Sequence, residues 1–229
     1  MKKALLPLAV AVTALLWTSG CKKDEDPQPV DLGHAYFPTD TGRWVDFAVD
    51  TVWRNDLSGV TDSLHYNLRE KITEDFTDPE GRPAQRLIRY RQDSATGIWI
   101  PKDVWWQVRG NTQVERAEEN QRRIKLIFPP RTGQFWNTNA LNTDREYELT
   151  YMEVDEPWGI NGLSFDSTLL VKTTYSNNAV ITNTYYERYA KHIGLIYRQV
   201  DSTDTQTDVN GVVRIRGTWY KQVVTGYGH

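Results

Sequence analysis

The most reactive side chain in this sequence is a single thiol, that of Cys21. One cysteine cannot form an internal disulfide, so in an exported protein the thiol is either free or chemically consumed. The four histidines, His34, His65, His192 and His229, show no metal-ligand spacing with one another or with carboxylates. We therefore expect no metal site and no cofactor, and the sequence indicates no catalytic residue.

Carboxylates are numerous enough to supply the facing pair that a glycoside hydrolase needs. The segment TDREYELTYMEVDEP holds several of them, but a chain with 30 acidic residues places such groups close together by chance. The segment DSTDTQTDVNGVV, with Asp201, Asp204, Asp208 and Asn210, lacks the first ligand and the final glutamate of an EF-hand loop. We interpret it as a polar hairpin tip.

The beginning of the chain has the pattern of a secretory signal. Lys2 and Lys3 precede an uncharged, mostly apolar stretch, residues 4–17, which is too short to span a membrane and has the length of a signal h-region. The following TSGC resembles a bacterial lipobox, although Thr18 stands where Leu, Val or Ile is usual. We expect residues 1–20 to be a lipoprotein signal peptide and Cys21 to be lipidated. The alternative is an ordinary cleaved signal with an incidental cysteine.

The segment KKDED after the cysteine is similar to the surface-export signal of Bacteroidota lipoproteins, which Lys23, Asp24 and Glu25 match. Charge and proline could equally keep a linker solvated. Residues 21–35 are expected to form a flexible tether, with a reach of at most roughly 45 Å from residue 22 onward. The predicted location is the outer membrane, facing outward, with the membrane bound through the lipid anchor.

Strand-type alternation runs through the remaining chain and predicts one β-rich domain over residues 36–229. In SLHYNLREKI, apolar Leu64, Tyr66, Leu68 and Ile72 share one face. Asn-Gly pairs at 161–162 and 210–211 predict two-residue hairpin turns, whereas VERAEENQRR suits either a helix or a hairpin tip. We expect about ten strands and little helix, arranged as a curved antiparallel sheet, half-barrel or sandwich-like.

Aromatic and basic residues within the strands are the main candidates for ligand contacts. Eight of the nine tryptophans and all twelve tyrosines follow residue 20. In VWWQV, Trp105 and Trp106 must point to opposite faces, so either both faces are covered or one ring is exposed to a ligand. In RLIRYRQ, Arg89 and Arg91 share a face that we interpret as solvated, with contact to an acidic ligand as the alternative.

Three segments together carry a family resemblance: YFPTDTGRWVDFAVDTV at 36–52, FPPRTGQFWNTNALN at 128–142 and YYERYAKHIGLIYRQ at 185–199. They are similar, in that order, to an uncharacterised family of Bacteroidota lipoproteins of the outer membrane or surface. Its members open with Tyr-Phe-Pro…Gly-Arg and carry Gly-x-x-Trp and then Tyr-Ala-Lys-x-Ile/Val-Gly-Leu. The resemblance implies a β-rich domain and brings no catalytic residues.

The function expected from the sequence is non-enzymatic binding or assembly at the cell envelope. A net charge of −3 gives no reason to expect nucleic acid as a partner. Three alternatives remain open, namely a carrier of a lipid or other apolar ligand in a half-barrel, a glycan-binding accessory protein and a surface glycoside hydrolase. A carrier predicts a long apolar cavity, a glycan binder predicts exposed aromatic platforms, and a hydrolase predicts two carboxylates within about 10 Å in a cleft.

Overall fold

The computed structural model describes residues 30–173, 178 and 180–229. The signal peptide at 1–20, the lipidation site Cys21 and the export-signal residues Lys23, Asp24 and Glu25 lie outside the described residues. One compact unit spans Asp31–His229. Among the described residues, no helix is long and apolar enough to cross a membrane.

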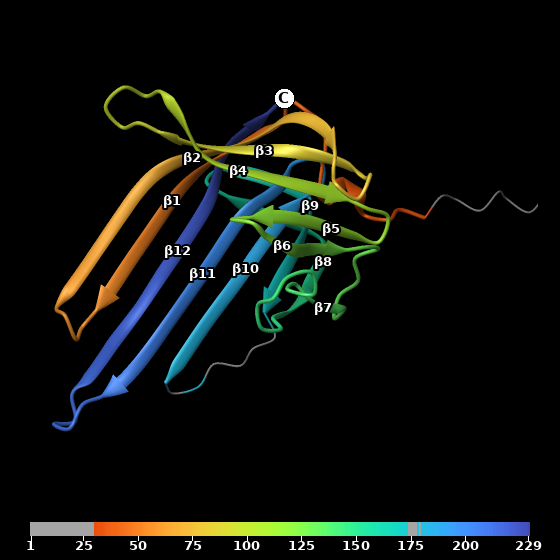
Figure 1. Ribbon diagram of the computed structural model, residues 1–229. Coiled ribbons are helices and arrows are strands. Elements are labelled where there is room, and N and C mark those ends of the chain that lie inside the picture. Colours follow the sequence, from red (N-terminus) through yellow and green to blue (C-terminus); the bar gives the residue numbers. More distant parts are fainter. Residues whose placement is uncertain (1–29, 174–177, 179) are drawn as a thin grey trace, which may run out of the picture. The chain divides into compact units, whose positions relative to one another are not determined.

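The described chain is almost entirely antiparallel β, as predicted, with essentially no helix (Figure 1). Its elements are the 3₁₀ helix η1 (His34–Tyr36) and the strands β1 (Trp44–Asn55), β2 (Val60–Thr77), β3 (Pro83–Gln92), β4 (Trp99–Arg109), β5 (Gln113–Glu118), β6 (Gln121–Ile127), β7 (Phe135–Asn137), β8 (Glu148–Ile160), β9 (Leu163–Thr173), β10 (Ile181–Ala190), β11 (Gly194–Thr207) and β12 (Val213–Gly228).

All twelve strands belong to one sheet, in the order β6-β5-β4-β3-β2-β1-β12-β11-β10-β9-β8-β7. The chain meanders outward from β1 to β6, then begins again at the opposite edge and returns to β12, which pairs with β1. The two edges approach each other, because Ile124 N on β6 donates to Thr138 O just beyond β7 at 2.9 Å. The sheet is therefore a nearly closed, barrel-like structure.

The hairpins show which turn predictions were correct. Asn161 and Gly162 both have positive φ, as the predicted two-residue turn between β8 and β9 requires. Positive φ at Glu119 and Asn120 makes VERAEENQRR a hairpin tip and not a helix. The turn before β12 is longer than the Asn-Gly pair predicted, because the Asp208 carboxylate accepts the backbone N–H groups of residues 210 and 212 and organises a wider polar tip.

The first residues of the folded unit close one end of the sheet. Tyr36 and Phe37 are buried in the larger hydrophobic core, and the Tyr36 hydroxyl donates to Asp155 Oδ1 at 2.7 Å. Residues 31–35, expected in the tether, belong to the folded unit, since Lys191 Nζ lies 3.3 Å from Asp31 Oδ2. Figure 1 shows η1 at the opposite end of the sheet from the β1–β2 and β11–β12 hairpin tips.

Inward side chains form successive rows across β2, β1, β12, β11 and β10, and their character changes along the strands. From the η1 end outward we name them the core row (Leu68–Phe47–Val224), the ionic row (Tyr66–Val49–Gln222–Arg198–Glu187), the aromatic row (Leu64–Thr51–Tyr220–Val200–Tyr185) and the outer row (Asp62–Trp53–Thr218–Ser202–Asn183). The core row is fully buried, whereas four of the five outer-row residues are exposed. The inner face thus changes from an apolar core to a solvated surface.

Candidate functional site

A cavity of about 690 Å³ lies on the inner face, between the aromatic and outer rows and the strands that cross opposite them. This volume is within the range of small-molecule sites. Five aromatic residues line it: Tyr66, Trp105, Tyr147, Tyr185 and Tyr220. Val200 is the one aliphatic residue among the described lining residues, and the rest are polar or charged.

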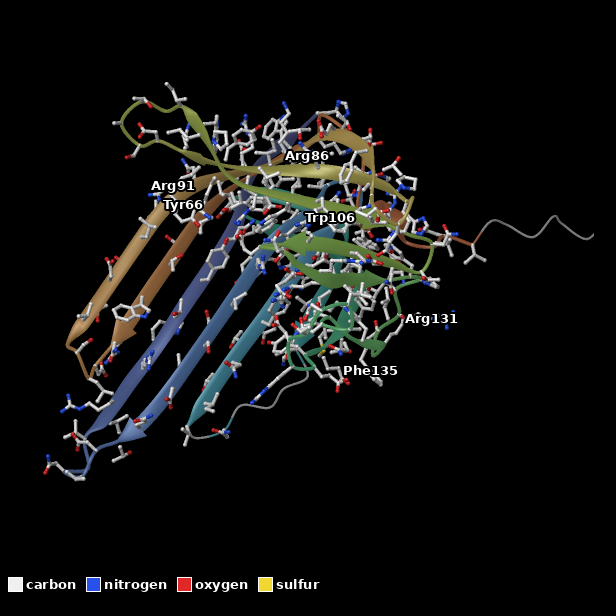
Figure 2. All side chains as sticks on the ribbon, in the orientation of Figure 1. Tyr66, Arg86, Arg91, Trp106, Arg131 and Phe135 are labelled. Atoms are coloured by element: carbon white, nitrogen blue, oxygen red, sulfur yellow. The ribbon has the colours of Figure 1, made fainter. Side chains whose placement is uncertain are left out.

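The tyrosines are brought together by strand register. Val200 on β11 lies directly opposite Tyr220 on β12 and Tyr185 on β10, so two rings flank one small aliphatic side chain on the same face. The ring of Tyr147 packs edge-to-face on Tyr185 with centroids 5.9 Å apart. On β2, the ring of Tyr66 lies under the Arg91 guanidinium, whose central carbon is 4.8 Å from the ring centroid. Figure 2 shows the two residues side by side.

The floor of the cavity is ionic. Lys125 Nζ on β6 lies 2.7 Å from Glu187 Oε1 and 3.7 Å from Glu118 Oε1, and it donates to the Tyr185 hydroxyl at 3.0 Å. Arg198 reaches the same two carboxylates, with Nε 3.3 Å from Glu187 and Nη2 3.6 Å from Glu118. The Tyr189 hydroxyl donates to the second oxygen of Glu187 at 2.6 Å.

A second buried ionic group continues the floor toward β3 and β4. Arg89 lies 3.3 Å from Glu70 and 2.9 Å from Asp103, with its guanidinium 4.1 Å from the ring centroid of Trp105. Arg116 approaches the other oxygen of Glu70 at 3.4 Å. The interpretation of Arg89 on a solvated face is therefore wrong, because carboxylates on neighbouring strands compensate its charge inside the sheet. Arg91 is exposed, as the interpretation requires, but it lies on the inner side of the sheet, where it pairs with Leu68.

The floor is electrically balanced but incompletely hydrogen-bonded. Within the described residues, its side chains inside the sheet combine four cations with four carboxylates: Arg89, Arg116, Lys125 and Arg198 with Glu70, Asp103, Glu118 and Glu187. The exposed Lys102 also approaches Asp103, at 2.8 Å. Despite these ion-pair distances, Arg89 Nε, Arg198 Nε and Glu118 Oε1 have no hydrogen-bond partner in the described part of the chain. These three atoms are shielded from solvent. The buried charges of the floor thus compensate one another, and Lys102, Glu119 and Arg123 add further charged side chains to the cavity lining.

Glu118 and Glu187, two buried glutamates of the floor, are held ionised. Burial opposes the charged form of Glu118, but Lys125 and Arg198 outweigh it and hold the pKa of this carboxyl well below its usual range. The pKa of Glu187 is lowered by the same two cations, again against the effect of burial. A glycosidase general acid needs a raised pKa, so this carboxylate pair does not have the properties of that chemistry.

These lowered pKa values predict a loss of stability in acid. The unfolded chain, with ordinary glutamate pKa values near 4.3, binds protons before the folded chain does. The free energy of unfolding is therefore expected to be constant above about pH 5 and to fall as the pH decreases through the folded pKa values. Urea denaturation between pH 7 and pH 3 measures this dependence, which should be shallower in Glu118→Gln. An equally steep dependence in that variant would contradict the assignment.

The two candidate tryptophans point to opposite sides of β4, as the alternation predicted. Trp105 is 5% exposed, lines the cavity and donates from Nε1 to Glu119 Oε1 at 3.2 Å. Trp106 is half-buried on the other side, where the Arg122 guanidinium lies 5.9 Å from its ring centroid (Figure 2). Only Trp105 belongs to the cavity.

Within the described residues, the histidines and the carboxylates of the segment 201–210 form no metal site. His65 is exposed and pairs with Asp50 at 2.6 Å. In the part of the chain that the structure describes, no group of three or more His, Cys, Asp or Glu side chains could hold a metal ion.

Sequence reasoning missed the ionic floor, although one signal of it was available. Glu70 lies at an inward position between Leu68 and Ile72, and Arg198 lies likewise between Ile196 and Val200. Glu187 occupies the same kind of position between two tyrosines. A charge at an apolar position of an alternating strand indicates a buried ion pair, whose partner only the fold reveals.

Comparison with known proteins shows only distant similarity. No family model matches the sequence, and no curated protein matches it. Among solved structures, a crystal structure at 2.70 Å, described as that of "a putative lipoprotein from Parabacteroides distasonis ATCC 8503", is 13% identical with a TM-score of 0.40. The match covers 84% of this chain and 98% of the other.

Proposed function

We propose that this protein is a lipid-anchored envelope protein that binds a neutral carbohydrate, without catalysis, in the cavity of its barrel-like sheet. The observation that carries the proposal is the combination of five aromatic side chains with hydrogen-bonding side chains around one cavity, above a buried floor in which cations and carboxylates are paired. Sugar rings present C–H faces that stack on aromatic side chains, and their hydroxyls both donate and accept hydrogen bonds. Among the lining residues, Gln121, Ser202 and Thr218 carry side chains that can both donate to and accept from such hydroxyls.

The same lining does not favour a carrier of lipid tails. An acyl chain in this cavity would displace water from polar and charged lining residues such as Lys102, Glu119 and Arg123 and give them no hydrogen bond in return, which is costly. Apart from Val200, the apolar surface of the described lining comes from rings and not from aliphatic side chains. Stacking is thus the main apolar interaction that the cavity offers.

The position of the cavity suits a ligand outside the cell. The chain enters the folded unit near η1, whereas the inner face opens toward the hairpin tips at the opposite end of the sheet (Figure 1). A protein anchored through Cys21 and exported by the signal at Lys23, Asp24 and Glu25 would present this open end to external glycans.

A glycan array tests the proposal. The labelled chain from residue 22 to 229, which contains the whole folded unit, is expected to bind at least one neutral oligosaccharide. Tyr220→Ala should weaken that binding about tenfold through the lost stacking surface, and Tyr220→Phe should retain most of it. Tyr227→Ala on the same strand, outside the cavity, is the matched control.

Two results would overturn the carbohydrate assignment. One is binding to no neutral glycan of the array. The other is a fatty acid or phospholipid adduct in native mass spectrometry that Tyr220→Ala removes, which would make the protein a carrier.

A further inference from the structure

The inner face continues past the cavity with an uncovered tryptophan. Trp53 belongs to the outer row, directly opposite Thr218 on β12, and Thr218 and Ser202 of that row line the cavity. Trp53 is 40% exposed although β1 is a central strand of the sheet. It is therefore next to the cavity and points to the same side of the sheet.

Packing among the described residues does not explain why Trp53 is exposed. It belongs to none of the hydrophobic clusters there, and the opposing strands end before they reach this part of the inner face (Figure 1). Leu64, one row closer to the cavity on β2, is also 45% exposed. Large apolar side chains that gather on an open face beside a cavity are typical of a binding surface.

The spacing of the ionic floor, Tyr220 and Trp53 sets a minimum length for a ligand that contacts all three. Trp53 is four residues beyond Val49 of the ionic row, which is about 14 Å along an extended strand. Tyr220 of the aromatic row lies between these two levels. A ligand that reaches from the ionic floor to Trp53 is longer than a single sugar ring.

Polar groups accompany Trp53 in the outer row. Asp62 lies directly opposite it on β2, and the hydroxyls of Thr218 and Ser202 follow on the other side. Asp62, Thr218 and Ser202 are all exposed. The outer row thus repeats the combination found in the cavity, an aromatic face beside hydrogen-bonding groups.

We propose, resting on the carbohydrate function above, that the ligand is an oligosaccharide chain and that Trp53 forms a distal subsite for it. One sugar unit occupies the cavity over the ionic floor, and the chain leaves along the inner face toward the hairpin tips, stacking a further unit on Trp53. Because the outer row is continuous with the cavity lining, one elongated ligand can contact both. This favours an oligosaccharide over a separate partner that binds Trp53 alone. Trp53 then determines how strongly affinity depends on chain length.

Titration calorimetry with malto-, cello-, xylo- and manno-oligosaccharides of two to seven units tests this subsite. For the series that binds, affinity should rise with length in the wild-type protein and then level off. Trp53→Ala should weaken the longest oligosaccharides about tenfold and leave the shortest unchanged. Trp53→Phe should lie between the two.

The matched control is Trp219→Ala, which removes a ring of the same type from the adjacent strand at the position paired with Val52, on the other side of the sheet. A length-independent affinity, or an equal loss at all lengths in Trp53→Ala, would overturn the subsite while leaving carbohydrate binding intact. Binding of no oligosaccharide by the wild-type protein would overturn both proposals. Self-association of the wild-type chain in sedimentation, lost in Trp53→Ala, would instead identify the patch as a contact between copies.

Discussion

Replacement of Glu187 by glutamine is expected to lower the free energy of unfolding by about 3–5 kcal/mol, the usual cost of breaking a buried ion pair from one side. Glu187 is completely buried and faces Lys125 at 2.7 Å and Arg198 at 3.3 Å. An amide has the same shape but no charge, so both cations would stay buried with only Glu118 to compensate them. Urea denaturation at pH 7, followed by tryptophan fluorescence, measures the loss.

The controls separate charge from packing. Glu156→Gln, at an exposed position of β8, should change stability by less than about 0.5 kcal/mol. Combining Lys125→Met with Glu187→Gln should cost less than the sum of the single changes, because the pair is then removed together. A Glu187→Gln effect below about 1 kcal/mol, or full additivity, would show that the floor is not coupled as its geometry indicates.

Replacement of Cys21 by serine is expected to move the protein from the membrane fraction to the soluble fraction. The hydroxyl of serine cannot take the place of the thiol as the acylated group, and only the acyl chains are expected to hold this chain at a membrane. Fractionation of cells that express the full chain measures the change. Retention of the serine variant in membranes would contradict the anchoring proposal.

Matched variants within the tether distinguish anchoring from export. Lys22→Ala, next to the cysteine but outside the motif, should leave both membrane binding and surface exposure unchanged. Alanine at Lys23, Asp24 and Glu25 together should keep the protein in the membrane fraction but protect it from protease added to intact cells. Unchanged protease sensitivity in that variant would exclude these three residues as the export signal.

The sequence by itself determined the fold class, because strand alternation and turn chemistry are local. Phe47 and Val49, two residues apart, both point into the core, and Asn161–Gly162 makes the turn that its backbone preferences predict. These features depend on neighbours along the chain, so they can be read without knowing which strands pair.

Only the tertiary structure decided where the charges lie and which aromatics form a site. Lys125 and Glu187 are separated by 62 positions along the chain and meet because β6 crosses over the inner face of β10. Alternation placed Trp105 and Trp106 on opposite sides of β4 but could not say which side was the interior. The closure of the sheet settles that point, since a pattern of period two has two equivalent faces until the sheet curves toward one of them.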